Sequence, residues 1–143
     1  MSSLPRVQLA INVSDVDAAV DFYSRLFGAQ PHKQRPGYAN FALDAPPLKL
    51  VLIENAAAAG SLNHLGVEVA DTAGVADAQQ RIADSGLAGR EEADVVCCHA
   101  RQDKVWVNDP DGAAWEVYTI TDDAPELALA ASSANGDGAC CAG

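Results

Sequence analysis

In the first part of the chain, hydrophobic residues recur first at every second position and then at the spacing of a helix. In RVQLAINV, apolar and other residues alternate, as is typical of a strand with one buried face. Apolar residues then recur at helical spacing from Val16 to Phe27, with Ser14 as the expected N-cap and Gly28 suited to a left-handed helix end. Three extended segments follow, with RPGY and DAPP as the turns between them: AQPHKQ, YANFAL and LKLVLIE.

The second part of the chain repeats this order. NHLGVEVA alternates, Asp71 or Thr72 can cap a helix, and Gly86 ends that helix as Gly28 ends the first. Three more extended segments follow, with DPDG as a strong turn between the last two: LAGREEA, ARQDKVWVN and AAWEVYTI. The pattern therefore contains strand–helix–three strands twice.

This duplication predicts an α+β fold of two tandem βαβββ modules, residues 1–57 and 58–122, that together form one domain. We expect each module to have a four-stranded sheet with its helix on the outer face, and the other sheet faces to line a shared, metal-containing cleft. In this arrangement Val7 and Leu65 face the helices, whereas Gln8 and His64 face the cleft. Residues 123–143, rich in Ala, Ser, Gly and Asp, show no periodic core face and are expected to be a disordered tail.

Composition narrows the classes of function. The 143 residues carry 20 acidic and 9 basic side chains, a formal net charge of −11 that disfavours nucleic acid and anionic membranes as partners. The N-terminus shows no signal peptide, and no apolar run approaches the roughly 20 residues of a membrane span. We therefore expect a cytoplasmic protein with reduced thiols. Its four cysteines form two adjacent pairs, which is not the spacing of a disulfide framework.

Three polar residues on predicted cleft-facing strands form a candidate metal site. Gln8 and His64 occupy matching strands of the two modules, and Glu116 lies on the last strand. An imidazole, a carboxylate and an amide oxygen can occupy one face of an octahedral divalent ion, a variant of the two-His-one-carboxylate arrangement of non-haem Fe(II) oxygenases. The alternatives are a structural histidine and a Glu116 held in an ion pair between apolar neighbours.

The adjacent Cys97 and Cys98 form a second candidate site. A regular strand would send the two side chains to opposite faces, so a paired function requires an irregular backbone. Counting from the helix-ending glycines aligns the pair with Tyr38, just after the RPGY turn, and predicts a loop between strands. Two alternatives stay open: small core residues, and a zinc site completed by His99.

The tandem pattern, the histidine of NHLGVEV and the glutamate of WEVYT resemble the vicinal oxygen chelate superfamily, which includes glyoxalase I and the extradiol dioxygenases. A closer resemblance, to the ArsI/CadI family, covers about residues 4–120. It rests on these segments: RVQLAINVSDVDAAVDFYSRLFGA, RPGYANFAL, PPLKLVLIEN, LNHLGVEV, CC, QDKVWV and WEVYT.

The ArsI/CadI resemblance implies an Fe(II)-dependent dioxygenase that cleaves the carbon–arsenic bond of trivalent organoarsenicals such as methylarsonous acid, giving arsenite. It implies that Gln8, His64 and Glu116 hold iron, with dioxygen as co-substrate; Ni, Co or Zn could occupy the same site. It also implies that Cys97 and Cys98 hold arsenic, which as a soft, thiophilic element matches thiolate ligands. Further candidates for lining the cleft are Tyr38, Lys104 and Tyr118.

Other readings remain open. The chain could sequester cadmium or arsenic without catalysis, or it could be another metalloenzyme of the superfamily, such as an extradiol dioxygenase. An isomerase would more often use a fourth protein ligand, but the repeat counterpart of Glu116 falls near Lys49. The resemblance gives no role to Cys140 and Cys141. Modules of this kind pair within or between chains, so a homodimer is compatible with the sequence.

Overall fold

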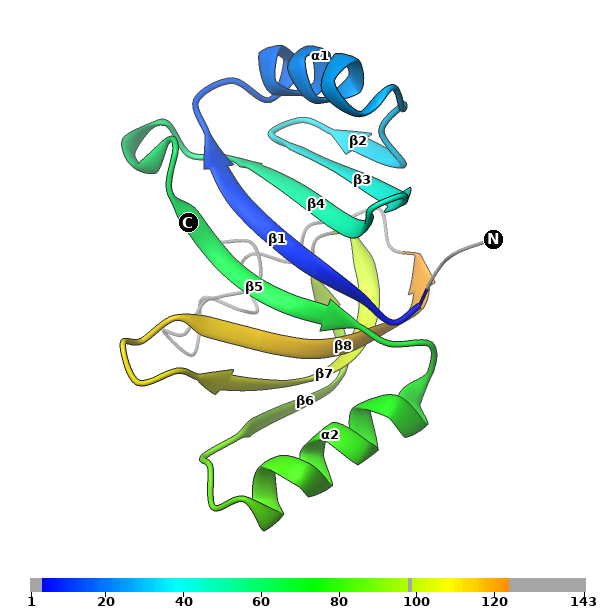
Figure 1. Ribbon diagram of the computed structural model, residues 1–143, viewed down its shortest axis with the longest axis vertical. Helices are drawn as coiled ribbons and strands as arrows, with labels where there is room; N and C mark the ends of the chain where they lie inside the picture. Colours follow the sequence, from blue (N-terminus) through cyan, green and yellow to red (C-terminus); the bar gives the residue numbers. More distant parts are fainter. Residues whose placement is uncertain (1–3, 98, 124–143) are drawn as a thin grey trace. The chain divides into compact units, whose positions relative to one another are not determined.

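The computed structural model describes residues 4–97 and 99–123, whose helices and strands follow the predicted order (Figure 1). The first set of elements is β1 (Arg6–Val13), α1 (Val16–Phe27), β2 (Lys33–Arg35), β3 (Tyr38–Asp44), β4 (Pro47–Glu54) and a short 3-10 helix, η1 (Ala56–Ala58). The second set is β5 (Leu62–Glu68), α2 (Thr72–Asp84), β6 (Arg90–Cys97), β7 (Ala100–Asn108) and β8 (Ala114–Asp123). The predicted tail beyond Asp123, with Cys140 and Cys141, lies outside the described residues.

The chain divides into two compact units, one ending at Leu65 and the other starting at Gly66. The division falls within β5, so the first unit contains the whole first set of elements and residues 62–65 of β5, and the second unit contains the remainder of the second set. The duplicated βαβββ order confirms the predicted α+β fold. No helix in the described part of the chain is long and apolar enough to cross a membrane.

In the first unit, the hydrogen-bonded strand order is β2-β3-β4-β1-β5. β1 runs parallel to β4, and β3 is antiparallel to both β2 and β4. The register aligns Gln8 with Lys49 and Leu9 with Leu50, so polar and apolar residues form separate rows across the sheet. This register gives the sheet one apolar face and one face that contains most of its polar side chains.

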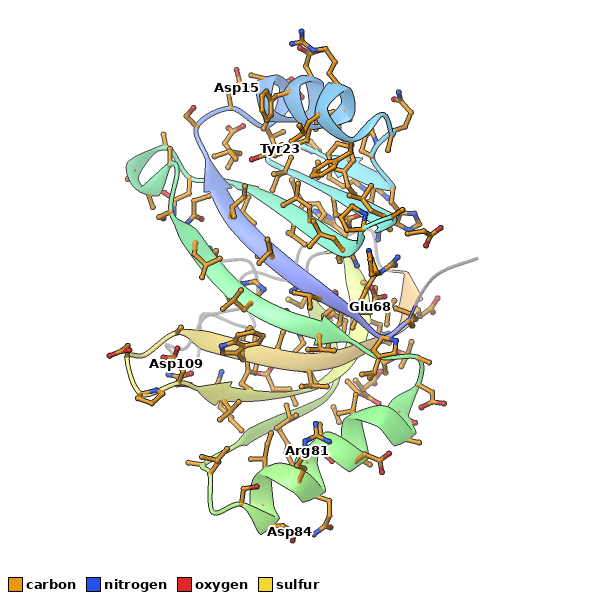
Figure 2. The ribbon with its side chains drawn as sticks, viewed as in Figure 1. Asp15, Tyr23, Glu68, Arg81, Asp84 and Asp109 are labelled. Carbon is orange, nitrogen blue, oxygen red and sulfur yellow. The ribbon has the colours of Figure 1, made fainter. Side chains whose placement is uncertain are left out.

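The apolar face of this sheet packs against α1. The buried part of the core consists of Val16, Ala39, Phe41, Leu43, Leu50 and Leu52, and Leu9, Ile11 and Val13 of β1 pack against it. Tyr23 of α1 also contacts this core, and Figure 2 shows it on the side of the helix that faces the sheet. Val7 was expected to join this face, but it stands outside the cluster and is 45% exposed.

Asp15, rather than the expected Ser14, caps α1. Its carboxylate accepts hydrogen bonds from the backbone N–H groups of Asp17 and Ala18, at 3.0 and 3.2 Å. Figure 2 shows Asp15 beside the start of the helix. A carboxylate at this position both satisfies two helix N–H groups and interacts favourably with the helix dipole. Gly28 ends the helix at φ 61°, in the left-handed conformation that its position in the sequence predicted.

The hydrogen-bonded order continues from β5 to β8 and β7, and β6 forms the edge. Asp71 caps α2 by accepting from the backbone N–H of Gly74 at 3.0 Å. The helix packs Ala78 and Ile82 onto a cluster of valines from β7 and β8: Val105, Val107 and Val117. As in the first unit, one face of the sheet is apolar and packs against a helix.

Two strands differ most from their predicted extents. β2 contains only Lys33–Arg35, because the AQPHKQ segment begins beside the end of α1 and includes Pro31, which cannot donate a backbone hydrogen bond. β6 begins at Arg90 and reaches Cys97, with an irregularity between Glu92 and Val95 where the register shifts. Asp94 adopts φ 55° there, as expected of an extra residue in a β-bulge.

Candidate functional site

Gln8 and His64 meet in the first unit, on neighbouring strands. Their Nε2 atoms lie 3.2 Å apart, Gln8 on β1 and His64 on β5. Both side chains are buried, at 4% and 3% exposed. The two predicted ligands from the matching strands therefore lie within contact distance of each other, on the face of β1 opposite Leu9 and Ile11.

The hydrogen bonds of His64 define its tautomer. Its Nδ1 lies 2.7 Å from the side-chain oxygen of Asn63, which can only accept, so the ring proton is on Nδ1. The amide nitrogen of Gln8 can only donate, so Nε2 of His64 must accept from it. The contact with Asn63 and the contact with Gln8 both agree with a lone pair on Nε2 that is directed towards Gln8. A neutral imidazole with this lone pair is the form that binds a metal ion.

Glu116 lies in the second unit, on β8, beside a buried ammonium group. Lys104 Nζ is 2.8 Å from Glu116 Oε1, and the two side chains are 0% and 4% exposed. The distance is that of an ion pair. Lys104 Nζ also lies 5.4 Å from the ring centre of Trp106 and 5.9 Å from that of Tyr118. The ion pair that we considered as the alternative role of Glu116 is therefore present.

The donor chemistry of these residues suits a divalent ion with nitrogen and oxygen ligands. His64 presents a lone pair, Glu116 supplies a carboxylate, and a half-turn of the Gln8 amide would present its oxygen in place of its nitrogen. No group of three or more His, Cys, Asp or Glu side chains among the described residues is arranged to hold a metal ion. Of the three candidate ligands, only His64 and Glu116 are of these four types, and they belong to different units. That Glu116 completes a metal site with Gln8 and His64 stays a prediction.

The candidates for lining the cleft are all buried. Tyr38 is 4% exposed and its hydroxyl accepts from the Asn40 amide at 2.9 Å, in the first unit. In the second unit, Lys104 pairs with Tyr118 and Trp106 with Glu116 across β7 and β8. These four side chains share the face opposite the valines that contact α2. Tyr118 and Lys104 therefore lie next to Glu116, and Tyr38 lies on β3, in the first unit.

Cys97 is the last residue of β6 and pairs with Ala100 of β7. In the first unit Arg35 pairs with Tyr38 in the same way, so the cysteine pair corresponds to the RPGY turn itself and not to the residue after it. Cys97 is 1% exposed, and its carbonyl accepts from the Gln102 amide at 2.8 Å.

The sulfur of Cys97 is in a disulfide, whereas we expected a reduced thiol. Its partner lies outside the described residues, as does Cys98. His99 follows with φ 63°, which agrees with the irregular backbone expected here. Cys97 is therefore at a turn between strands, as a paired function of the two cysteines requires.

Three polar residues near His64 were not among the predicted site residues. Asn63 Nδ2 donates to Asn12 Oδ1 at 3.0 Å, and Asn12 Nδ2 donates to Ser61 Oγ at 3.0 Å. Asn12 lies four residues after Gln8, so period two alone places it on the same strand face and could have identified it. Asn63 and Ser61 carry no such signal, because their role depends on how the chain before β5 returns to β1.

Comparisons with known proteins give the family. The model of the glyoxalase/bleomycin resistance protein/dioxygenase superfamily matches residues 6–117. A trivalent organoarsenical cleaving enzyme of Thermomonospora curvata is 56% identical over 96% of this chain and 89% of its own length. The cadmium-induced protein CadI of Mycobacterium bovis is 55% identical over 84% of this chain and 79% of its own.

Solved structures agree on the fold. The Mn(II)-bound glyoxalase of Novosphingobium aromaticivorans has a TM-score of 0.59 at 18% identity, over 88% of this chain and 42% of that one. Methylmalonyl-CoA epimerase of Mycobacterium tuberculosis has a TM-score of 0.55 at 18% identity, over 92% and 97%. The chain therefore belongs to the glyoxalase/bleomycin resistance protein/dioxygenase superfamily and, within it, to the family of the trivalent organoarsenical cleaving enzymes and CadI.

Proposed function

We propose that this protein is an Fe(II)-dependent dioxygenase that cleaves the carbon–arsenic bond of trivalent organoarsenicals such as methylarsonous acid. The observation that carries the proposal is the 56% identity, over 96% of this chain, to a trivalent organoarsenical cleaving enzyme. The contact between Gln8 and the lone pair of His64 supports it, because it supplies two of the ligands that such an enzyme needs.

In this proposal Gln8, His64 and Glu116 hold the iron, which supplies Lewis-acid and redox chemistry for the activation of dioxygen. Burial of all three side chains, at 3–4% exposed, limits competition from bulk water. Lys104 balances the charge of Glu116 while that carboxylate is not bound to a metal ion. The ammonium group of Lys104 also makes cation–π contacts with the rings of Trp106 and Tyr118.

Cys97 and Cys98, once reduced, bind the arsenical in the same proposal. Two thiols replace the two hydroxyls of methylarsonous acid, forming two As–S bonds and releasing two molecules of water. The second bond forms within one molecule, so its effective concentration is high. The As–C bond is left exposed for cleavage, and the position of Cys97 at the end of β6 provides the hairpin turn on which both thiols would sit.

The overall reaction balances without another reductant. One methylarsonous acid and one dioxygen give one arsenous acid and one formaldehyde; the methyl carbon loses four electrons and dioxygen gains four, while arsenic stays trivalent. We therefore expect oxygen uptake, arsenite and formaldehyde in equal amounts when Fe(II)-loaded, reduced protein receives methylarsonous acid under air. Anaerobic and iron-free samples are the controls, and neither should release arsenite.

The alternative is capture of cadmium or arsenic by the thiols without chemistry. The 55% identity to the cadmium-induced protein CadI is the reason to test this alternative. Under the same assay, a non-catalytic protein would take up a fixed amount of arsenical per chain and consume no oxygen. That result, with Fe(II) present and thiols reduced, would contradict the proposed dioxygenase.

A further inference from the structure

We infer that Asn63 is a positioning residue for His64, and that Asn12 and Ser61 hold Asn63 in place. Asn63 fixes the proton of the imidazole on Nδ1 and so keeps Nε2 available as a ligand. The inference rests on the proposed role of His64 in holding iron. It adds three residues to that site, none of which would contact the metal.

The evidence is a continuous chain of side-chain hydrogen bonds in the first unit. It runs from His64 Nδ1 to Asn63 at 2.7 Å, from Asn63 to Asn12 at 3.0 Å and from Asn12 to Ser61 at 3.0 Å. The Ser61 hydroxyl then donates to the carbonyl of Ala58 at 2.6 Å. Each group in this order donates to the next, from the imidazole to the Ala58 carbonyl. Because that carbonyl can only accept, it fixes the direction of every bond in the chain.

Backbone hydrogen bonds hold the two ends of this chain together. Asn12 N–H donates to Ser61 O and Gly60 N–H donates to Asn12 O, both at 2.9 Å. Gly60 adopts φ 86°, a conformation that side chains rarely permit, as the chain turns into β5. The segment after η1 is thus attached to the end of β1, and this attachment brings Ser61 and Asn63 to the two sides of the Asn12 amide.

The chemical consequence concerns the two forms of a neutral imidazole. The proton sits on either Nδ1 or Nε2, and an acceptor facing Nδ1 favours the first form. Histidines that bind metals generally donate their other N–H to a carbonyl or carboxylate, and loss of that partner typically lowers metal affinity about 10–100-fold. Without Asn63, the Gln8 amide can turn its oxygen towards the ring and the proton can move to Nε2, where it would occupy the lone pair that the metal requires.

The test has a spectroscopic part that needs no metal. Ring nitrogen shifts in ¹⁵N NMR, measured on the full-length, metal-free protein at about pH 8 where an ordinary imidazole is neutral, report which nitrogen carries the proton. The chain has three histidines, so His64→Asn identifies the signal of His64. The variants are Asn63→Ala, Asn63→Asp and Asn12→Ala. Asn108→Ala, at the exposed end of β7, is the matched control.

The second part measures Co(II) affinity of the same variants by equilibrium dialysis. We expect Asn63→Ala to lose the pure Nδ1–H form and to bind Co(II) about 10–100-fold more weakly. Asn63→Asp keeps an acceptor for Nδ1 but loses the donor to Asn12 Oδ1, so the Asn12 amide must turn over and donate to the new carboxylate. With that reversal this variant should bind as tightly as the parent protein or more tightly, and Asn12→Ala should fall between the two. Asn108→Ala should match the parent in both measurements.

The possible failures are distinguishable. If Asn63→Ala leaves both the tautomer and the Co(II) affinity unchanged while His64→Asn abolishes binding, Asn63 has no positioning role and the proposed site stands. If His64→Asn itself keeps full Co(II) affinity, His64 is not a ligand, and both the site and this inference are wrong. Thermal unfolding of each variant separates these outcomes from loss of the fold.

Discussion

Lys104 and Glu116 place an ammonium nitrogen 2.8 Å from a carboxylate oxygen where both side chains are almost completely buried. They lie diagonally across β7 and β8, because Trp106 is directly opposite Glu116 and Tyr118 is directly opposite Lys104. A buried charge is tolerated only with a partner, so neither side chain is independent of the other. The same carboxylate is the proposed third ligand of the metal ion, and the ion pair and the metal would share it.

Removal of the ammonium alone should be costly. We expect Lys104→Met to lower the free energy of unfolding of the metal-free protein by about 3–5 kcal/mol, because Glu116 would keep a buried charge without this cation. Denaturation in urea measures the change. The double variant Lys104→Met with Glu116→Gln removes both charges and should recover most of the loss. A cost below about 1 kcal/mol for the single variant would contradict the importance of the pair.

Two leucines allow a matched test of the first core. Leu52 is fully buried in the cluster under α1, whereas Leu26 on the helix is 58% exposed. We expect Leu52→Ala to cost about 2–5 kcal/mol, since it leaves a cavity among packed side chains, and Leu26→Ala to change stability by less than about 1 kcal/mol. Urea denaturation of both variants checks the difference. Equal effects would show that the core lies elsewhere.

The start of α1 gives a test between two neighbouring residues. Asp15 accepts two backbone hydrogen bonds at the N-terminus of the helix, so Asp15→Ala should cost about 1 kcal/mol. Ser14→Ala, at the exposed residue before it, should cost less than about 0.5 kcal/mol. Thermal unfolding of the two variants compares them directly. A larger effect at Ser14 would show that Ser14, as the sequence suggested, is the cap of α1.

The sequence predicted the order of elements because hydrophobic periods differ between strands and helices, and both periods occur twice. It also predicted that Gln8 and His64 share one face, since alternation fixes the side of a strand on which a residue lies. It did not predict the cap at Asp15, because Ser and Asp are both good caps and adjacent here.

The features that the sequence could not predict depend on contacts made by irregular segments of the backbone. The roles of Ser61 and Asn63 depend on the turn at Gly60, whose path is set by hydrogen bonds to Asn12 that have no sequence signal. The bulge in β6 is a similar case. It adds one residue before Cys97 and so contributes to the error of counting from the helix ends, which misplaced the cysteine pair relative to its hairpin. Lys104 was expected only as a residue lining the cleft, and the sequence did not identify it as the ion-pair partner of Glu116.

The last prediction separates substrate binding from turnover. In the proposed enzyme, Cys97→Ser removes one of two arsenic ligands and leaves Gln8 and His64 in contact, so the variant should bind Fe(II) or Co(II) normally and lose most of its affinity for methylarsonous acid. His64→Ala should do the reverse: it should keep arsenical binding and lose the metal and all release of arsenite. Both measurements require a reductant, because Cys97 is in a disulfide and only reduced thiols can bind arsenic. Equilibrium dialysis with each ligand, together with the arsenite assay, reads out the two functions separately.

If Cys97→Ser turns over as fast as the parent protein, the thiols do not hold the substrate. If both variants lose both ligands, the two sites are a single one and the division of roles proposed for the cysteines and the histidine is wrong.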